Sequence, residues 1–568
     1  MSEKIKITIV TDNEKLNNNV DVSKVKSMNV THDSSVTIMS TLLKNNLISG
    51  SFCGGRGDCG RCRIQFLRGV TIPTQLERGV LDAEELRLGY RLACLAKPRN
   101  DCVIKLAFSD EPETAVVTEV MDVPENFDYK GQQNSHTGNR TSDVTELADD
   151  REITHISGQS VILKQPADKE QKGIKNTDVI IAVDLGTTTI AMQLMETDTG
   201  CVLDTYCEMN PQRRYGADVL SRIQASCDGN REVLQRLVIE VLERGVKRFK
   251  ERAANIKYMC IAGNTTMEHL FMGYDVSSLG RSPFTPAEIG LQEFRHPAWD
   301  FSVRLVPGIS AFVGGDIVAG LYACGMLTGK PHPVLFIDLG TNGEMAIADG
   351  ERMIVTATAA GPAFEGGVGA EIIGSDMVAC AAVLLNQGIL DETGLLKEPF
   401  FTDGVAVRID DRGHYQFTPG RSDQSLYLTQ KDIRSLQMAK AAVRAGVEIL
   451  VKRIEVEQGD ELRSKNAQSE VRQDLQVYLA GGFGDYLDVE AAFRIGLLPG
   501  HMRGHVRAVG NTALLGAYRI GRDLYLGKTD KQILEQSLSS IESINLAKQV
   551  EFEGLYIQYM NFAPSHSV

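Results

Sequence analysis

Apolar and polar residues alternate over several short stretches near the start of the chain, which is the pattern of strands with one buried face. Residues 4–10 (KIKITIV) and 28–36 predict two strands. Residues 34–48 predict a helix whose apolar residues follow helical spacing, with Ser34 or Ser35 as its cap. A strand over 61–69, a short helix over 81–94 and a closing strand over 101–108 follow. This order predicts a small mixed α/β domain over residues 1–106.

A polar, acidic stretch with little apolar periodicity begins near Ser109. Its composition predicts an acidic linker over 107–176. One or two short strand-like runs after residue 152 leave room for a small ordered middle element. We expect a flexible tether, which would let the first domain swing between two partners and keep its effective concentration high at both.

Buried apolar strands that run into glycine turns recur in the rest of the chain. Residues 178–185 lead into the turn DLGTTT, and residues 334–339 lead into the turn DLGTNG. A third apolar strand at 477–480 runs into GGFGDY. The repeated strand–turn–strand unit predicts an α/β module over 177–565 that consists of two subdomains.

A long amphipathic helix is predicted over 431–454, before the third of these strands. We expect its basic residues to form its solvated face. The charged stretch 457–472 is expected to be a surface loop.

Composition narrows the class of protein. The net charge of −14 argues against a nucleic-acid surface, which would be basic. No apolar run reaches the length of a transmembrane helix, and MSEKIKITIV lacks the apolar region of a signal peptide. Eleven cysteines, most of them scattered, do not form a disulfide framework. We therefore expect a cytoplasmic protein in a reducing compartment, and its net charge is compatible with docking other proteins.

Four cysteines in the first domain have the spacing C-x5-C-x2-C…C: Cys53, Cys59, Cys62 and Cys94. This spacing, with the β-grasp order of elements, resembles plant-type [2Fe–2S] ferredoxins, which use C-x4-C-x2-C…C. Four thiolates are needed because each iron takes two protein sulfurs. Glycines between the cysteines let the loop curl around a cluster. Zinc is the alternative, although the stretch has one tight cysteine pair and a single histidine, His32.

The glycine turns of the second module suit a nucleotide. Glycine lets the backbone approach phosphate, hydroxyl and amide groups bind its oxygens, and carboxylates hold Mg²⁺ through water. The three turns together resemble the acetate and sugar kinase, Hsp70 and actin superfamily, in which two ribonuclease-H-like domains close over ATP. The candidates are Asp184 and Asp338 for Mg²⁺, Gly186, Thr187, Thr188, Gly340, Thr341 and Asn342 for phosphate, and Gly481, Gly482 and Gly484 for adenosine.

Other nucleotide motifs are missing from the sequence. It has no P-loop lysine motif, and no dinucleotide glycine motif follows the first strand of this module.

Four further side chains have two interpretations each. Asp316 and Glu344 could position the water that attacks ATP, or could cap turns, and Glu344 is kept with Asp184 and Asp338 as a catalytic candidate. His269 is expected to be a packed helix residue rather than a cobalt ligand. Cys102 is expected to be a packed strand residue.

Several longer stretches narrow the family: 210–223, 261–273, 283–286 (PFTP), 307–320 and 356–367. Together with the cysteine module, they are similar to the reductive activators of corrinoid-dependent methyltransferase systems. These are ATP-dependent iron–sulfur proteins of acetogens and related anaerobes. The resemblance covers the cysteine module and the whole of 177–565, and it is weakest in 107–176, where relatives have a middle domain that contributes to dimerisation.

The resemblance implies a function. A corrinoid protein stalls when Co(I) loses an electron, and the activator would return one electron from its [2Fe–2S] cluster to Co(II), with ATP hydrolysis making the step possible. It implies the cluster and ATP roles given above, a corrinoid protein as partner, a low-potential electron donor and a homodimer. It does not identify the corrinoid protein, the methyl donor or the reductant.

Three alternatives remain open at this point. A small-molecule kinase with a ferredoxin domain would need a carboxylate base against its substrate hydroxyl. A radical-dehydratase activator would hold a [4Fe–4S] cluster with cysteines of its ATPase domain. A plain electron-transfer module on a nucleotide-regulated scaffold would show no redox-linked ATP turnover.

Overall fold

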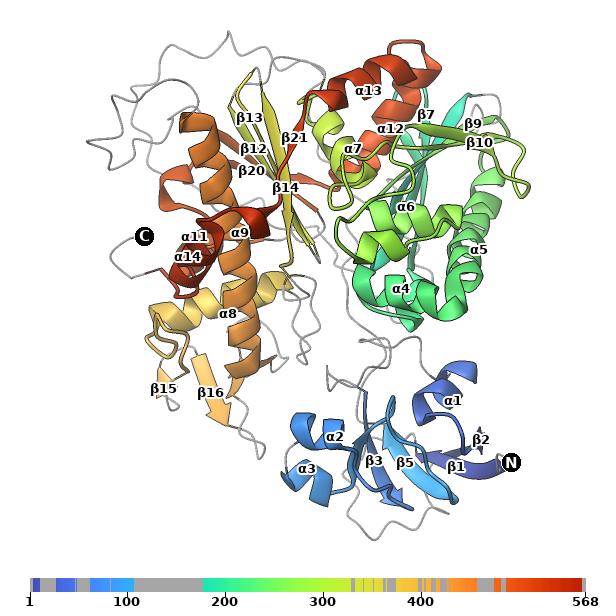
Figure 1. Cartoon of the computed structure of the whole chain (residues 1–568), viewed down its shortest axis with the longest axis vertical. Helices are drawn as coiled ribbons and strands as arrows, with labels where there is room; N and C mark the ends of the chain where they lie inside the picture. Colours follow the sequence, from blue (N-terminus) through green and yellow to red (C-terminus); the bar gives the residue numbers. More distant parts are fainter. Residues whose placement is uncertain are drawn as a thin grey trace, which may run out of the picture.

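The computed structural model describes most of the chain outside the connector (Figure 1). The predicted linker 107–176, the charged stretch 457–472 and the candidates Cys53, Cys59, Thr341, Gly482 and Gly484 lie outside the described residues. The described residues are 4–10, 27–45, 47, 62–81, 83–106, 177–327, 333–340, 342–350, 352–360, 364, 374–396, 401–402, 405–409, 415–418, 426–428, 430–456, 475–481 and 487–563.

The first domain is a five-stranded sheet in the order β2-β1-β5-β3-β4. β1 pairs antiparallel with β2 and parallel with β5, while β3 pairs antiparallel with β5 and with β4. This is the β-grasp arrangement that the strand order predicts. The elements are β1 (Lys4–Val10), β2 (Ser27–Asp33), α1 (Ile38–Lys44), β3 (Arg63–Arg68), α2 (Gln75–Val80), α3 (Ala83–Arg87), β4 (Tyr90–Leu92) and β5 (Cys102–Leu106).

The first helix starts later than its sequence predicts. α1 begins at Ile38, and the Thr37 hydroxyl accepts a hydrogen bond from the backbone N–H of Ser40 at 3.3 Å. The predicted cap at Ser34 or Ser35 is therefore wrong. The N–H and hydroxyl of Ser35 both donate to a carboxylate oxygen of Asp33, in a turn that precedes the helix.

The first half of the second module is a six-stranded sheet in the order β10-β11-β9-β6-β7-β8. β6, β7 and β8 are antiparallel, and β9 and β11 run parallel to β6 on its other side. The elements are β6 (Val179–Leu185), β7 (Thr189–Glu196), β8 (Val202–Met209), α4 (Val219–Ala225), α5 (Arg231–Lys250), β9 (Ile256–Gly263), α6 (Thr265–Met272), β10 (Gln292–Arg295), β11 (Ser302–Leu305) and α7 (Gly315–Ala323).

The second half repeats this arrangement in the order β20-β19-β12-β13-β14-β21. β12, β13 and β14 are antiparallel, and β19 and β20 run parallel to β12 on its other side. Its elements are β12 (Val334–Leu339), β13 (Gly343–Ala348), β14 (Met353–Thr358), α8 (Gly374–Asn386), α9 (Gln430–Val456), β19 (Gln476–Ala480), α11 (Val489–Ile495), β20 (Val506–Gly510), α12 (Thr512–Tyr525), α13 (Lys531–Ser539), β21 (Glu542–Ser543) and α14 (Phe552–Gln558).

A separate four-stranded antiparallel sheet lies between α8 and α9 in the sequence. Its order is β15-β16-β17-β18. The strands are β15 (Phe401–Thr402), β16 (Val405–Ile409), β17 (Tyr415–Thr418) and β18 (Leu426–Leu428).

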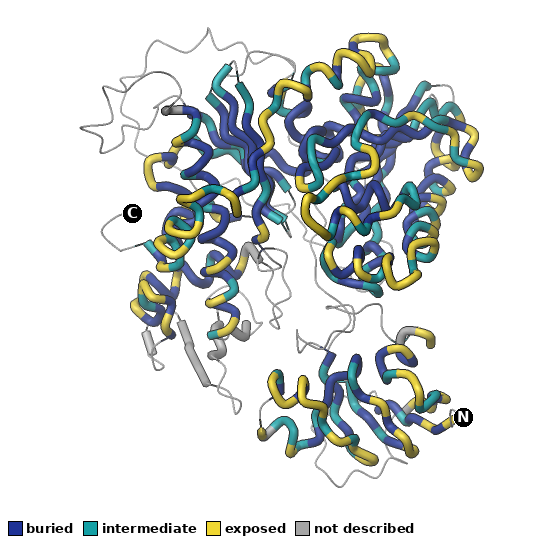
Figure 2. The backbone as a smooth tube through the Cα atoms, viewed as in Figure 1, coloured by how far each residue is buried: buried dark blue, intermediate teal, exposed yellow. Residues whose placement is uncertain are grey.

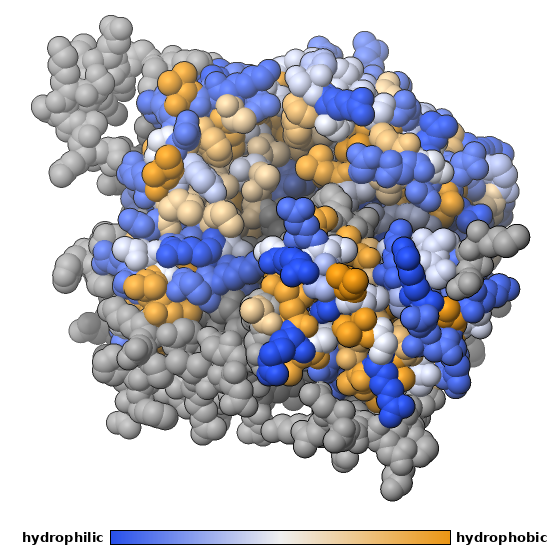
Figure 3. All heavy atoms as spheres, turned by 60° about the horizontal axis from the view of Figure 1, so that its bottom comes forward, coloured by the Kyte–Doolittle hydropathy of each residue, from blue (hydrophilic) through white to orange (hydrophobic). Residues whose placement is uncertain are grey.

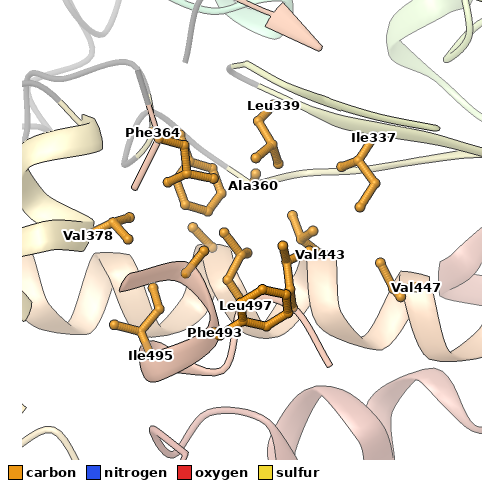
Figure 4. Close-up of a cluster of buried hydrophobic side chains, with 14 of the residues drawn as sticks. Ile337, Leu339, Ala360, Phe364, Val378, Val443, Val447, Phe493, Ile495 and Leu497 are labelled. Carbon is orange, nitrogen blue, oxygen red and sulfur yellow. The ribbon is translucent and has the colours of Figure 1, made fainter. Parts of the chain in front are cut away.

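Each half has its own hydrophobic core. The central strands β6 and β7 of one large sheet, and β12 and β13 of the other, are buried along most of their length (Figure 2), as the continuous apolar runs predict. In the second half, Ile337 and Leu339 of β12 pack against Val443 and Val447 of α9 and against Phe493 of α11 (Figure 4). The repeat predicted from the two D-L-G-T turns is therefore a repeat of the fold.

The basic residues of α9 are not all solvated, and this corrects the expectation from sequence. Lys440 is only 1% exposed. Its Nζ donates hydrogen bonds to the backbone oxygens of Tyr559 and Asn561 at 2.6 and 2.5 Å. Burial and the nearby Arg444 lower the pKa of Lys440 to about 7. Lys440 thus ties the C-terminal segment to α9.

Helices α7 and α12 lie side by side between the two large sheets (Figure 1). A Cβ atom on Gly516 of α12 would lie 1.9 Å from the backbone oxygen of Ala319 on α7. A Cβ on Gly320 would lie 2.7 Å from the ring of Phe336 and 2.9 Å from the hydroxyl of Thr512. Glycine at these positions lets the two helices, and through them the two halves, approach closely.

We expect Gly516→Ala to destabilise the module, because the added methyl group overlaps the backbone of α7. An overpacked contact of this kind costs about 1–3 kcal/mol or more. The measurement is the melting temperature, with Gly554→Ala as control, since a Cβ on Gly554 of α14 meets nothing within 4 Å. Equal melting temperatures for the two variants would show that the α7–α12 contact is not tight.

No helix in the described ranges is long and apolar enough to cross a bilayer. Hydrophilic residues are interspersed with apolar ones on the described part of the face in Figure 3.

Candidate functional site

The two described cysteines of the first domain are brought together by a strand pair. Cys62 directly precedes β3 and Cys94 follows β4, and the register pairs Arg63 with Leu92. The N–H of Ala93 donates to the Cys62 oxygen at 2.8 Å, and the two Sγ atoms lie 3.2 Å apart. Two sulfurs bound to one tetrahedral metal at about 2.3 Å lie roughly 3.8 Å apart. Cys62 and Cys94 are therefore close enough to bind a single iron.

Other residues of the domain fit a sulfur-only centre. His32 is fully buried, and its Nδ1 is 2.6 Å from the hydroxyl of Thr41. Burial lowers the pKa of His32, so the ring is held neutral by its surroundings. Cys102 lies on β5 in the hydrophobic core, where burial and then Asp101 raise the pKa of its thiol to about 12. It is a packed strand residue, as its position outside the cysteine pattern predicts.

The first glycine turn of the second module is held by three polar side chains from elsewhere in the chain. Asn210 donates from Nδ2 to the Gly186 oxygen at 2.8 Å. Asn264 donates from Nδ2 to the Thr187 hydroxyl at 3.0 Å, and the guanidinium of Arg222 donates to the Thr187 backbone oxygen. Arg222 is fully buried. These contacts fix the conformation of the turn.

Asn210, Arg222 and Asn264 are called the clamping residues from here on. Their sequence pattern did not predict that they hold this turn. Asn210 and Arg222 belong to the stretch 210–223, and Asn264 belongs to 261–273. Both stretches contribute to the family resemblance, which gives these three residues no individual role. For Asn264 the sequence does contain a local signal, because an asparagine before a helix is a typical cap, and Asn264 caps α6 by accepting from Met267 N–H at 3.0 Å.

The second turn lies at the end of β12. The N–H of Gly340 donates to the Asn342 oxygen at 2.9 Å. Gly481, which follows β19, has φ of 87°, and a Cβ there would lie 2.5 Å from a carboxylate oxygen of Asp338. Glycine is therefore needed at 481 both for its left-handed conformation and for the approach of Asp338.

Four candidate carboxylates from both halves interact with one another. Asp184 is the second-last residue of β6 and accepts a hydrogen bond from Asn511 Nδ2 at 2.8 Å, which crosses between the halves. Burial raises the pKa of Asp184 to about 6. Burial, and then the charge of Asp184, raise the pKa of Asp316 in the first turn of α7 to about 7. Glu344 lies opposite Asp338 in the β12–β13 register. Its pKa is raised well above the ordinary value by burial and by Asp316 and Asp338.

Glu268 is a fifth carboxylate, which the sequence analysis missed. It is buried on α6 and accepts a hydrogen bond from Gly263 N–H at 3.1 Å. A Cβ on Gly315 would lie 2.4 Å from its Oε1, so Glu268 supports the first turn of α7. Burial and the charge of Asp316 raise its pKa. Neither spacing nor neighbouring residues distinguish it from other helical glutamates.

His269 is fully used in packing, as expected. Its Nδ1 lies 2.7 Å from the Thr265 oxygen, and its Nε2 accepts a hydrogen bond from the Ala287 N–H at 3.0 Å. The ring is therefore neutral with its proton on Nδ1, and burial lowers its pKa.

This group of carboxylates suits a hydrated cation with a polyphosphate. Carboxylates whose charges act on one another are raised in pKa unless a cation offsets them. Within the part of the chain that the structure describes, no three Asp, Glu, His or Cys side chains are close enough to hold a metal ion by themselves. Mg²⁺ commonly keeps several waters and takes one or two carboxylates together with substrate phosphates. The residues present fit that mode of binding.

The raised pKa of Asp316 predicts a pH-dependent stability. Its folded pKa of about 7 is above the ordinary value of ~3.9 for an aspartate. As the pH rises towards 7, the folded protein must release a proton that the unfolded chain has already lost. The free energy of unfolding therefore falls through that range and stays lower above it. Asp316→Asn is expected to raise stability at pH 8 by ~1–3 kcal/mol and to change it little at pH 5.

The measurement is the melting temperature of the nucleotide-free protein at both pH values. Asp198→Asn is the control, because Asp198 is exposed. A gain that is the same at pH 5 and pH 8 would contradict the assignment of the effect to ionisation of Asp316.

Three family models match the chain. A 2Fe-2S iron-sulfur cluster binding domain matches residues 24–99. The RACo middle region matches 179–328, and the C-terminal domain of RACo, the ASKHA domain, matches 332–371 and 368–567. The two RACo models together span more than half of the chain.

Curated relatives and a solved structure agree with these matches. The corrinoid activation enzyme RamQ of Eubacterium limosum is 28% identical over 72% of this chain and 73% of its own length. The [Co(II) methylated amine-specific corrinoid protein] reductase of Methanosarcina barkeri is 25% identical over 67% of this chain and 76% of its own length. The solved structure of a reductive activator for corrinoid, iron-sulfur protein shares the fold over 98% of both chains, with a TM-score of 0.57 and 23% identity. The chain therefore belongs to the RACo family of reductive activators of corrinoid proteins, which join a 2Fe-2S domain to an ASKHA domain.

Proposed function

We propose that this protein returns a corrinoid protein from Co(II) to Co(I) in a methyltransferase system, in a step that depends on ATP. The observation that carries the proposal is the presence, in one chain, of a thiolate pair suited to iron and of a carboxylate site suited to Mg-ATP. The names of the two curated relatives support it, since both refer to corrinoid activation or reduction.

The cluster residues have one task. Cys53, Cys59, Cys62 and Cys94 would hold a [2Fe–2S] cluster, which supplies one electron when reduced and is then reduced again by a low-potential donor. Cys62 and Cys94 are only 2% and 5% exposed, and this burial keeps water from the two ligands.

The nucleotide residues of the first half receive phosphate. The turn Gly186–Thr187–Thr188 would bind phosphate oxygens through N–H and hydroxyl groups, held in place by Asn264 and the other clamping residues. Asp184 would hold Mg²⁺ through water, with its orientation fixed by Asn511. A carboxylate fixed in this way needs no rearrangement when the ion arrives.

The second half completes the site. Asp338 would hold Mg²⁺ through water from the other side, Gly340, Thr341 and Asn342 would bind phosphate, and Gly481, Gly482 and Gly484 would leave room for adenosine. Glu344, whose raised pKa makes its carboxylate a stronger base, would position the attacking water and accept its proton.

ATP is needed because the electron transfer runs uphill. Plant-type clusters have reduction potentials of about −400 mV, and Co(I) is a stronger reductant than such a cluster. A coupling of about 1–3 kcal/mol between nucleotide state and partner state corresponds to roughly 45–130 mV for one electron. Closure of the two halves on ATP would supply this coupling by favouring a Co(II) form with a weakened axial ligand.

We also propose that the protein acts as a homodimer.

The test is anaerobic. The chemically reduced protein is mixed with Co(II) corrinoid proteins from candidate methyltransferase systems, and cobalt absorbance is followed with and without Mg-ATP. Appearance of the Co(I) band only with Mg-ATP is the expected result. ATP turnover with an intact cluster but no Co(I) from any candidate would overturn the proposal in favour of another low-potential acceptor, and phosphate transfer to a small hydroxyl compound would point to a kinase.

A further inference from the structure

Two aromatic side chains protrude together from loops of the first half. Phe312 is 45% exposed, and Phe284 is partly exposed. Their ring centroids lie 5.1 Å apart with an angle of 61° between the planes, which is an edge-to-face contact. Pro283 beside them is exposed and Ala311 is partly exposed, so the two loops present one apolar tip.

The backbone at Phe284 adopts a conformation that is unusual for a residue with a bulky side chain. Phe284 has φ of 60°, and it is the one non-glycine residue with positive φ in the part of the chain that the structure describes. A bulky side chain is disfavoured in this conformation, whereas glycine adopts it freely. Residues held in such conformations cluster at functional sites. The local fold alone would be better served by glycine.

Both loops are anchored to α6. The loop with Phe312 is fixed because Thr265, the first residue of α6, donates from its hydroxyl to the Ser310 oxygen at 2.7 Å. The loop with Phe284 is fixed because the N–H of Ala287 donates to His269 Nε2 at 3.0 Å. The two loops also bond to each other, from Gly308 N–H to the Ile289 oxygen at 2.8 Å. The aromatic pair is thus presented by a rigid support.

The same helix contacts the phosphate turn. Asn264, which caps α6, donates to the Thr187 hydroxyl. The loop with Phe312 continues through Gly314 into α7, and a Cβ on Gly314 would lie 2.5 Å from the Thr265 nitrogen. A shift of the phosphate turn on nucleotide binding would therefore move α6 and the aromatic tip with it.

We propose that Phe284 and Phe312 are the contact through which the corrinoid protein docks on the first half of the ATP-binding module. The inference rests on the proposed function, because an activator driven by ATP needs a partner contact that responds to the phosphate turn. Rigid aromatic side chains are the residues that most often dominate the binding energy of an interface. The partner surface that fits this tip is an apolar patch of the corrinoid protein rather than a charged one.

The test compares Phe284→Gly, Phe312→Ala and the double variant with Ile533→Ala, a control whose side chain is 55% exposed on α13. Phe284→Gly suits the backbone conformation at that position, so the loop is expected to stay folded. The probe is the Co(II) corrinoid protein from which the wild-type protein forms Co(I) in the test of the proposed function. The readouts are the concentration of that protein that gives half the maximal rate of Co(I) formation, the ATP hydrolysis without partner, and the visible spectrum of the cluster.

We expect the half-saturating concentration to rise about tenfold or more in the Phe284 and Phe312 variants. ATP hydrolysis without partner and the cluster spectrum should match those of the wild type, and Ile533→Ala should match it in all three readouts. An unchanged half-saturating concentration would overturn the docking proposal and leave the proposed function intact. Loss of basal ATP hydrolysis in Phe284→Gly would also overturn it, by placing the pair in the nucleotide site. Absence of Co(I) with the wild-type protein and every candidate corrinoid protein would instead overturn the proposed function.

Discussion

Cys94→Ala is expected to abolish formation of Co(I) while leaving ATP hydrolysis in place. Cys94 is buried beside Cys62, with the two sulfurs 3.2 Å apart, and alanine leaves one iron with a single protein sulfur and the cluster with three of its four thiolates. The residues proposed to bind ATP belong to separate sheets, so their chemistry does not need the cluster. The measurements are the visible spectrum of the reconstituted protein, anaerobic Co(I) formation and phosphate release.

The matched control is Cys102→Ala. Cys102 is a buried cysteine of the same domain, but it packs on β5 in the core. We expect this variant to keep the cluster and to lose only a little stability. A cluster that survives in Cys94→Ala and is lost in Cys102→Ala would reverse the assignment of ligands.

Asp184→Asn is expected to lower ATP hydrolysis by about 100-fold or more, since a carboxylate that orients the metal in phosphoryl transfer contributes several kcal/mol to the transition state. Asparagine keeps the shape of the side chain and an oxygen for the bond from Asn511, so the fold should persist. The cluster spectrum should remain that of the wild type, and Co(I) formation should fall with ATP hydrolysis.

Asp178→Asn serves as the comparison at the other end of the same strand. Asp178 directly precedes β6 and contacts Lys257 at 3.2 Å and the hydroxyl of Tyr525. Loss of these contacts should lower the melting temperature and leave the catalytic rate near that of the wild type. If Asp178→Asn lost ATP hydrolysis and Asp184→Asn kept it, the carboxylate assignment would be wrong.

The sequence predicted those parts of the fold that are determined by residues close together in the chain. The D-L-G-T turns and the apolar strands before them fix where each half begins, because glycine turns and continuous apolar runs act over a few residues. The position of Cys62 could be predicted for the same reason, because it directly precedes a strand in which apolar and polar residues alternate clearly. The short helix α2 was missed, although Thr74 and Glu77 form a capping box there.

The parts that sequence did not predict depend on contacts between distant segments. Arg222 and Thr187 are 35 positions apart, and Asn511 and Asp184 are 327 positions apart. Nothing in the sequence next to Glu268 shows that α7 will pack over its carboxyl group. Lys440 was placed on a solvated face because helical spacing alone cannot show that the C-terminal segment will cover it.

The α7–α12 contact limits where the chain can be cut into fragments that fold on their own. α12 comes near the end of the chain, yet Leu514 and Ala517 cover Ile180 and Ala182 of the first sheet. The hydroxyl of Tyr518 donates to the backbone oxygen of Glu196 at the end of β7, and the guanidinium of Arg522 donates to that of Thr197 just beyond it. A fragment that stops at residue 328, where one family model ends, would leave this apolar face of its sheet open to water. The smallest autonomous folding unit of the second module therefore includes both halves, and a split protein would have to be reassembled from its two pieces through α12.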